Sequence, residues 1–377
     1  MPIRLWPRLW SLLRLKDADE QIDDYAVRTD WSRSHGEINY SSFVYFDVDG
    51  DGCYGSSDRP FGGIRVRLMK DGQVIASART NNNGFANFRS SSSSRSAPIC
   101  RSGTYQFVVS VPDAFAVTSR NSTQSMEFKP RPGSISGIGS DEMLQPVGLT
   151  PDKVIKGRLP KNAKLSITAL NGTLLVDEKQ YASQTAFLYR VPAASDAVVF
   201  SIGGWTRRTQ LSCYPIDLGL LDPQRGSLEP SRKTETIDFD SLNPRGLRKI
   251  PSGYADLRWF NLNAMTRDFT KNGQGYVNGN TSGDHIAYTS SGYPALVYSD
   301  TPFDFIGVHL SVAWLKAEGE TAIIESWRGD ELIAKDRVTL SALSPVFYNP
   351  GLPNITRIRL ATDHYWQMVL DDLVMAR

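Results

Sequence analysis

Residues 45–68 read YFDVDGDGCYGSSDRPFGGIRVRL, a loop rich in aspartate and glycine with a strand-like stretch on each side. In residues 63–68 the alternation places three aliphatic side chains on one face and two arginines on the other, which is typical of a half-buried β-strand. Residues 42–46 (SFVYF) predict another strand just before the loop. The region therefore predicts two strands joined by an acidic loop.

Turn signals and short strands continue after this loop. Asp71–Gly72 predicts a two-residue hairpin turn that leads into a strand over residues 74–78. The sequence Asn-Asn-Asn-Gly at residues 81–84 predicts a second turn, and residues 103–109 predict a closing strand. Together these signals predict a small β-sandwich over residues 38–115.

The acidic loop has the composition of a calcium site. Ca²⁺ prefers about six to eight oxygen ligands, and a D-x-D-x-D-G loop places carboxylates at its first, third and fifth positions. Strands rather than helices flank the loop, so we expect a structural ion and not an EF-hand sensor. The alternative is a solvated, aspartate-rich turn. The predicted Ca²⁺ ligands are Asp47, Asp49, Asp51, the backbone carbonyl of Cys53, and Asp58.

This region resembles a known family. Residues 45–68, the turn at residues 80–88 and Gly103-Thr-Tyr105 are similar to the SdrD B-type repeat of bacterial surface proteins, a module of the Cna-B, prealbumin-like sandwiches. The resemblance implies a calcium-stabilised spacer or adhesive module. Some relatives carry a Lys–Asn isopeptide crosslink, but the first strand here, residues 41–46, contains no lysine.

The rest of the chain continues the all-β pattern, so we expect tandem β-sandwich domains throughout. The C-terminal part resembles an uncharacterised bacterial extracellular domain of jelly-roll-like architecture, on the basis of residues 251–259, 275–284, 303–305 and 371–373. The expected organisation is a connecting segment at 116–150, a second small β-domain at 151–220, a linker at 221–233, and a jelly-roll-like sandwich at 234–377.

A second cation site is predicted in the C-terminal sandwich. Two aspartates lie on alternate residues of its first predicted strand and two lie in its last strand, and these strands often neighbour each other in jelly rolls. The alternative is that these charges discourage aggregation at a sheet edge. The four residues are Asp238, Asp240, Asp371 and Asp372.

Aromatic residues in a Gly/Ser/Asn-rich half of the same domain suggest a carbohydrate-binding surface. Sugar rings stack on exposed aromatic faces, while amides and carboxylates orient the sugar hydroxyls. The competing interpretation is that most of these aromatics, and Trp259, Trp314 and Trp327 in particular, fill the core. The predicted ligand-binding residues are Tyr254, Tyr276, Asn278, Asn280 and Asp284; further aromatics in the cluster are Phe260, Tyr288, Tyr293 and Tyr298.

The sequence gives little support for an enzyme. Ser282-Gly-Asp-His285 contains the residue types of a hydrolase triad, but four adjacent residues cannot converge as nucleophile, base and orienting acid. The histidines show no metal-ligand spacing, and no phosphate-binding glycine loop occurs. Among the three cysteines, Cys53 and Cys100 could form a disulfide within the first sandwich.

The first 37 residues form an amphipathic arm followed by an acidic lead. Residues 1–16 (MPIRLWPRLWSLLRLK) interleave basic residues with tryptophan and leucine, without the unbroken apolar core of a conventional signal peptide. We expect the arm to dock on a larger assembly or on its own subunit, for example in a homo-oligomer. No transmembrane span is predicted, and 42 Lys+Arg against 40 Asp+Glu argue against a nucleic-acid partner.

These features favour a non-catalytic bacterial surface or extracellular protein. In this interpretation Ca²⁺ stabilises the first sandwich, and the C-terminal sandwich binds a glycan, surface polysaccharide or other envelope polymer. The alternative is a structural or receptor-binding spike or fibre protein of a phage-like particle.

Overall fold

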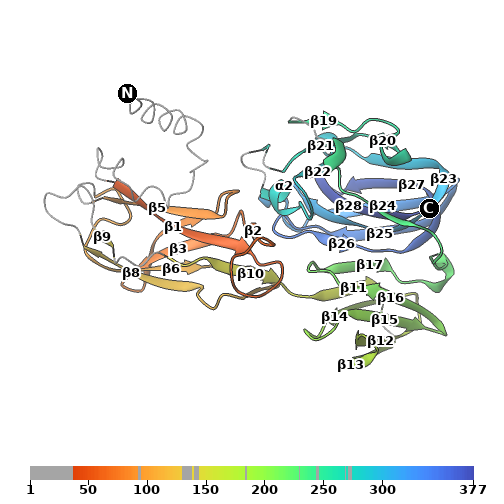
Figure 1. Cartoon of the computed structure of the whole chain (residues 1–377), viewed down its shortest axis with the longest axis horizontal. Coiled ribbons are helices and arrows are strands. Elements are labelled where there is room, and N and C mark those ends of the chain that lie inside the picture. Colours follow the sequence, from red (N-terminus) through yellow and green to blue (C-terminus); the bar gives the residue numbers. More distant parts are fainter. Residues whose placement is uncertain are drawn as a thin grey trace. The chain divides into compact units, whose positions relative to one another are not determined.

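Strands make up almost all of the regular structure, which confirms the all-β prediction (Figure 1). The chain divides into two compact units, residues 1–150 and 151–377. The predicted arm at residues 1–16 lies outside the described residues. This computed structural model describes residues 37–91, 95–129, 138–139, 144–182, 185–228, 230–242, 246–267, 269–270 and 274–377.

The first unit contains two sheets. In one sheet, β1 pairs antiparallel with β5 along residues 37–43 and then parallel with β10 along residues 44–46. This sheet contains β1 (Glu37–Phe46), β2 (Arg59–Pro60), β5 (Phe85–Ser91), β7 (Phe115–Val117) and β10 (Val147–Pro151). The other sheet has the order β4 (Gln73–Arg79), β3 (Arg65–Lys70), β6 (Gly103–Val109), β8 (Thr123–Lys129) and β9 (Ile138–Gly139).

The core of this unit follows the period-two pattern of its strands. Val66 and Leu68 are buried on the inner face of β3, and Arg65 on the outer face is exposed. The rings of Phe88 from one sheet and Phe107 from the other meet edge to face, with centroids 5.6 Å apart. Aromatic contacts of this kind fix the spacing of the two sheets.

Residues 116–150 form more than a connection. Strand β8 has its own alternating pattern and pairs with β6, while β10 pairs with β1 at the centre of the other sheet. These strands therefore belong to the two sheets of the first unit. The parallel β1–β10 pair joins segments about 100 residues apart, and local sequence patterns do not reveal such a pairing.

The second unit begins with a small sandwich, as the sequence predicts for residues 151–220. The sheet β13–β12–β15–β16 faces the strands β14, β11 and β17 across a core that includes Ile167, Phe200 and Leu218. The expected hairpin turn at residues 171–172 joins β12 to β13. The strands are β11 (Val154–Arg158), β12 (Lys164–Asn171), β13 (Leu174–Ala182), β14 (Ala186–Arg190), β15 (Ala197–Ile202), β16 (Trp205–Gln210) and β17 (Ile216–Leu220).

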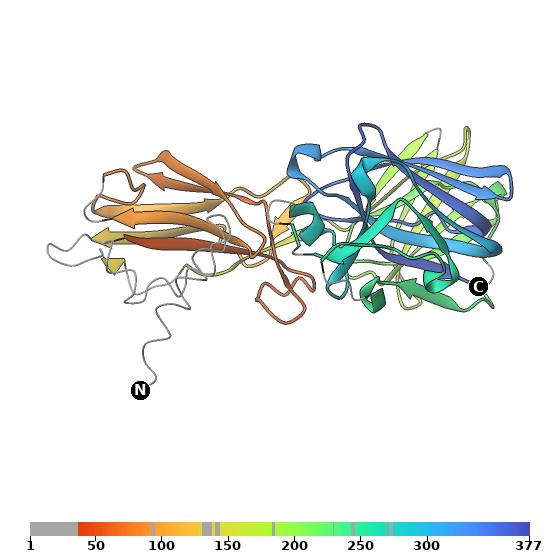
Figure 2. The same ribbon diagram turned by 90° about the horizontal axis from the view of Figure 1, so that it is seen from above.

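A jelly-roll-like sandwich follows, built around the 18-residue strand β23 (Figure 2). The first part of β23 pairs with β20 and β27, and its last part pairs with β26 and β28. Register shifts between residues 298 and 309 mark the change from one set of partners to the other. A single strand thus contributes to both layers around the core.

The other elements of this sandwich are short strands and single helical turns. The strands are β18 (Thr234–Ile237), β19 (Arg248–Lys249), β20 (Arg258–Phe260), β21 (Leu262–Thr266), β22 (His285–Thr289), β23 (Ala295–Val312), β24 (Thr321–Arg328), β25 (Glu331–Thr339), β26 (Val346–Tyr348), β27 (Leu352–Thr362) and β28 (Met368–Ala376). The helical turns of the second unit are η3 (Pro223–Arg225), η4 (Asp240–Leu242), η5 (Tyr254–Asp256), α2 (Gln274–Asn278), η6 (Ser290–Gly292) and η7 (Leu315–Ala317).

The two sandwiches of the second unit are joined by more than the segment 221–233. Strand β17 pairs in parallel with β26, so one sheet runs from the small sandwich into the larger one. The buried carboxylate of Asp336 accepts hydrogen bonds from Arg158 at 2.5 Å, Arg225 at 3.1 Å, and the Tyr348 hydroxyl at 2.8 Å. Because Arg225 belongs to the predicted linker, that segment packs against both sandwiches.

Candidate functional site

The acidic loop of the first unit gathers three of its predicted ligands. It follows the end of β1, and Asp47 and Asp58, at its two ends, are buried while Asp49 is exposed. Carboxylate oxygens of these three residues all lie within 4.8 Å of one another. Gly52 turns the chain at a φ of 79°, and an added Cβ there would lie 2.9 Å from the carbonyl oxygen of Thr118.

Backbone N–H groups fold around the two buried carboxylates. Asp47 accepts hydrogen bonds from the N–H groups of Gly50 at 2.6 Å and Gly52 at 2.9 Å. Asp58 accepts two further N–H groups, those of Val48 at 3.0 Å and Gly55 at 2.7 Å. These bonds fix the carboxylates in place and leave each oxygen with further acceptor capacity.

The charges of the loop shift the pKa values of its own side chains. Burial, and then the charges of Asp47 and Asp49, raise the pKa of Asp58, while the Ser57 hydroxyl donates to Asp49 and lowers its pKa. Burial and the same acidic loop raise the pKa of Tyr45. In the part of the chain that the structure describes, no lysine or arginine forms an ion pair with the three carboxylates. Hard oxygen donors that lack a cation from the protein fit Ca²⁺.

Asp51 does not join the other three predicted aspartate ligands, and the predicted disulfide does not form; the Cys53 carbonyl stays a prediction. The Asp51 carboxylate lies outside the group of three and accepts the N–H of Cys53 at 2.7 Å, in a local turn at the surface. Cys53 and Cys100 are both free thiols, so the disulfide is absent.

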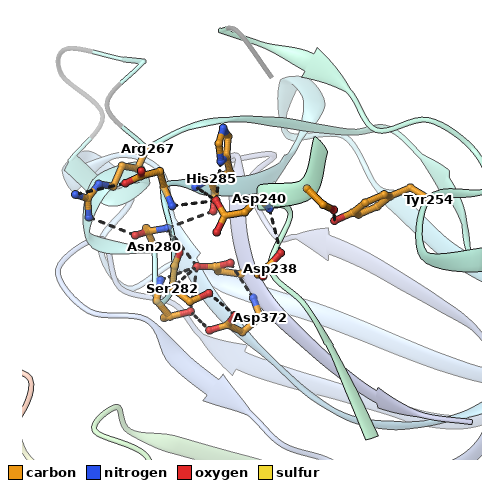
Figure 3. Close-up of polar contacts among 12 residues, drawn as sticks. Asp238, Asp240, Tyr254, Arg267, Asn280, Ser282, His285 and Asp372 are labelled. Atoms are coloured by element: carbon orange, nitrogen blue, oxygen red, sulfur yellow. Dashed lines mark hydrogen bonds and ion pairs between the residues drawn. The ribbon is translucent and has the colours of Figure 1, made fainter. Parts of the chain in front are cut away.

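The second predicted cation site is described in Figure 3. As expected, the first and last strands of the domain, β18 and β28, are paired. However, Asp240 accepts the N–H groups of Asp284 and His285, each at 3.0 Å, and its Oδ1 lies 2.6 Å from His285 Nδ1. Asp238 accepts the N–H of Asp240. Asp240 therefore holds the loop that precedes β22, and Asp238 holds the backbone at Asp240.

Asp371 and Asp372 hold the same loop from β28. Asp371 accepts the N–H groups of Thr281 at 2.6 Å and Ser282 at 3.1 Å, and Asp372 accepts the hydroxyl groups of both residues at 2.6 Å. Burial, followed by the charge of Asp372, raises the pKa of Asp371 to about 8. Within the described residues, no three of the four predicted ligands have oxygens within 4.8 Å of one another. They do not gather as a metal site; N–H and O–H donors occupy them instead.

Three predicted ligand-binding residues are structural. Tyr276 is only 2% exposed and donates its hydroxyl to Gln367 at 2.6 Å. Asn280 is also buried and donates to the carbonyl of Ser282 at 2.6 Å, and Asn278 donates to the carbonyl of Ala342 at 2.9 Å. Side chains committed to internal partners in this way are not available to a sugar, so these assignments are corrected.

The other two predicted ligand residues are accessible to different degrees. Tyr254 is half-buried beside Phe239 and Trp259, and its hydroxyl lies 3.0 Å from that of Ser241. Burial raises its pKa. The Asp284 side chain is 78% exposed and lies 3.9 Å from Arg267. Neither residue forms an exposed aromatic surface.

An exposed aromatic pair lies elsewhere in this sandwich. Tyr293 and Tyr365 are 62% and 63% exposed, and their ring centroids are 5.8 Å apart. Tyr293 belongs to the aromatic cluster noted in the sequence, but Tyr365 does not. Both tyrosines follow turn sequences, Ser290-Ser-Gly292 and Asp363-His364, and this turn context was the available signal that they lie outside the core.

The residues of the apparent triad motif have separate partners. Ser282 donates its hydroxyl to Asp372, His285 pairs with Asp240, and Asp284 is exposed. The Nε2 atom of His285 is buried without a hydrogen-bond partner among the described residues. A nucleophile, base and orienting acid are therefore not assembled from this motif.

Comparison with known proteins finds only distant structural similarity. No family model and no curated protein matches the chain. The structure is similar to the shaft pilin SpaA from Lactobacillus rhamnosus GG (10% identity, 51% of this chain and 99% of that chain, TM-score 0.22). It is also similar to the K2 cleaved adhesin domain of Lys-gingipain (8% identity, 38% of this chain and 99% of that chain, TM-score 0.26). A third similar structure is the major pilin of Streptococcus pyogenes (6% identity, 86% of this chain and 98% of that chain, TM-score 0.21). Identities and TM-scores this low do not assign a function to this chain.

Among the described residues, no helix has the length and apolar character needed to cross a bilayer.

Proposed function

We propose that this chain is a non-catalytic surface or extracellular protein whose first unit is stabilised by Ca²⁺ and whose C-terminal sandwich binds a carbohydrate or another envelope polymer. The observation that carries the calcium part is the gathering of Asp47, Asp49 and Asp58, with which no lysine or arginine of the described residues forms an ion pair. In a compact, partly buried loop, three such charges repel one another unless a counter-ion joins them.

The three carboxylates would hold the ion. Asp47 and Asp58 lie at the two ends of the loop, so one ion bound by both would close it against the end of β1 and the start of β2. When bound, Ca²⁺ supplies positive charge and oxygen coordination. Its role in the proposal is to stiffen a spacer between the arm and the second unit.

The non-catalytic part rests on the separation of the triad-like residues. Ser282, Asp284 and His285 have partners that position the loop before β22, and none of those contacts aligns a nucleophile with a base. The alternative assignment, a spike or fibre protein of a phage-like particle, depends on residues 1–16, which lie outside the described residues. Stable oligomers that require residues 1–16 would favour it.

Thermal unfolding of the intact chain in excess Ca²⁺ and in EDTA tests the calcium proposal. A ligand that binds only the folded state at about 100 times its Kd contributes about 2.7 kcal/mol, which corresponds to a rise in Tm of about 5–10 °C for a unit of this size. We expect Asp47→Asn to abolish the rise.

The matched control is Asp113→Asn, which removes an exposed acid of the same unit. It should retain the full calcium response. An equal Tm in Ca²⁺ and EDTA for the unaltered chain would contradict the proposal, as would an equal response in Asp47→Asn.

A further inference from the structure

The exposed tyrosine pair is the feature of the C-terminal sandwich that the contacts described above leave unexplained. Tyr293 lies just before β23, and Tyr365 lies in the turn between β27 and β28. Both rings are more than 60% exposed, although large aromatic side chains usually contribute to the core. Their planes are inclined by 60°, so the rings do not cover one another's faces.

The two loops that carry these rings are in direct backbone contact. An added Cβ on Gly292 would lie 1.5 Å from the carbonyl oxygen of Tyr365, and the φ of Gly292 is 70°. Only glycine therefore permits this approach. The side-chain amide of Asn261 donates to the carbonyls of Tyr293 at 3.0 Å and Ser290 at 3.2 Å. The position of the Tyr293 loop is thus fixed by contacts with Asn261 and with the backbone of Tyr365.

The backbone around the pair is strained. Tyr365, Ser291 and Asn261 all have a positive φ, of 60°, 53° and 57° respectively. A left-handed conformation is unfavourable for residues other than glycine, and in particular for a bulky aromatic residue. Such strain persists only where the surrounding structure imposes it, and it is concentrated at binding sites. Here it holds an aromatic side chain in solvent.

The residues beside the rings favour a saccharide over a protein partner. Ser291 and His364 are exposed next to the two tyrosines in the chain, and Asp363 beside His364 is ion-paired with Arg337; all three are polar, although His364 also contacts Glu320 through its Nδ1 atom. The core of a protein interface is depleted in charged residues, whereas aromatic faces beside hydroxyl and carboxylate groups suit a sugar ring with its apolar and polar sides. Phe260, next to Asn261, adds another exposed ring, at 57% exposure.

We propose that Tyr293 and Tyr365 form a preorganised saccharide-binding platform, with a pyranose ring stacked on at least one of the two tyrosine faces. This inference deepens the proposed function and rests on it, because it locates the carbohydrate site of the C-terminal sandwich. It replaces Tyr276, Asn278 and Asn280, which are committed to internal contacts.

The test uses the full chain on an array of neutral and acidic oligosaccharides, followed by calorimetric titration with the hexasaccharide that binds best. We expect Tyr293→Ala and Tyr365→Ala each to weaken binding at least tenfold with an unchanged Tm, because both side chains are exposed. Tyr365→Phe keeps the ring and should bind within about threefold of the unaltered chain, since stacking on a ring supplies most of the affinity.

The control variant is Phe269→Ala, which removes another exposed ring of the same unit. It should bind normally. Saccharide binding that survives both tyrosine-to-alanine changes would overturn the platform and keep the proposed carbohydrate function. Absence of binding to every oligosaccharide would overturn both. Tyrosine variants that change the oligomeric state without saccharide would show that the pair contacts a second copy and would also overturn the platform.

Discussion

Two groups of buried acids in this chain have different surroundings. In the second unit, Asp336 faces two guanidinium groups, those of Arg158 and Arg225. In the first unit, Asp47 and Asp58 face each other and Asp49, and no lysine or arginine in the described part pairs with them. A buried carboxylate needs compensating charge or hydrogen bonds. At Asp336 the protein supplies its own cations, whereas at the acidic loop the proposed function calls for an external one.

The largest effect on stability is expected when the charge of Asp336 is removed. Asp336→Asn leaves the largely buried Arg225 without its anionic partner and weakens the contact between the two sandwiches of the second unit. We expect a loss of about 3–5 kcal/mol in unfolding free energy, because breaking a buried ion pair leaves the other charge buried without a partner. Urea unfolding measures this loss, which should be equal in Ca²⁺ and in EDTA.

A matched surface pair provides the control for this prediction. Asp363→Asn removes the partner of Arg337, whose side chain is 53% exposed, against 10% for Arg225. The expected loss is about 0–1 kcal/mol, as for most surface ion pairs. A similar loss for both variants would contradict the account of Asp336 as the main polar contact between the sandwiches.

Asp371 extends the comparison, because it accepts hydrogen bonds but has no ion pair with a lysine or arginine among the residues that the structure describes. Its pKa, raised to about 8 by burial and by Asp372, exceeds its ordinary value of 3.8. The folded chain therefore binds this proton more tightly than the unfolded chain does. Its stabilising contribution is complete below about pH 4 and is lost as the pH rises to about 8.

Urea unfolding between pH 5 and pH 9 measures this dependence. The unaltered chain should lose stability across this range relative to Asp371→Asn, in which the titrating group is absent. Parallel pH profiles for the two proteins would contradict the raised pKa. Other titrating groups are common to both chains, so the difference isolates Asp371.

The smallest expected effect concerns Asp51, a predicted ligand that lies outside the group of three. Its carboxylate closes a local turn by accepting the Cys53 N–H. Asp51→Asn retains an oxygen for that hydrogen bond, so the calcium affinity should change by no more than about threefold, against a complete loss for Asp47→Asn. Calorimetric titration of both variants measures this, and an equal loss would place Asp51 among the ligands.

Local sequence patterns predicted much of the fold and part of the site. The alternation in residues 63–68 determined strand β3, and the glycines at 50 and 52 made the acidic loop curl around Asp47. Strand β3 and the acidic loop both depend on residues that are close together in the sequence. The role of residues 116–150 was not predictable in the same way, because β10 becomes a strand by pairing with β1, far away in the sequence.

The ligand residues show the same limit. Tyr276 is buried among residues that include Ile286 and Val369, and its hydroxyl donates a hydrogen bond to Gln367, 91 residues away; no local pattern contains that information. Likewise, Tyr293 and Tyr365 become neighbours only when β23, β27 and β28 assemble. Composition indicated that aromatic residues were available for a ligand surface. Tertiary packing decided which of them remained exposed.

The most direct test of the central claim is calorimetric titration of Ca²⁺ into the EDTA-treated, full-length chain. The account predicts one bound ion per chain, a site abolished by Asp47→Asn or Asp58→Asn and unaffected by Asp240→Asn. Absence of binding would contradict it. So would an ion whose binding survives Asp47→Asn and is lost in Asp240→Asn, because the calcium site would then lie in the second unit.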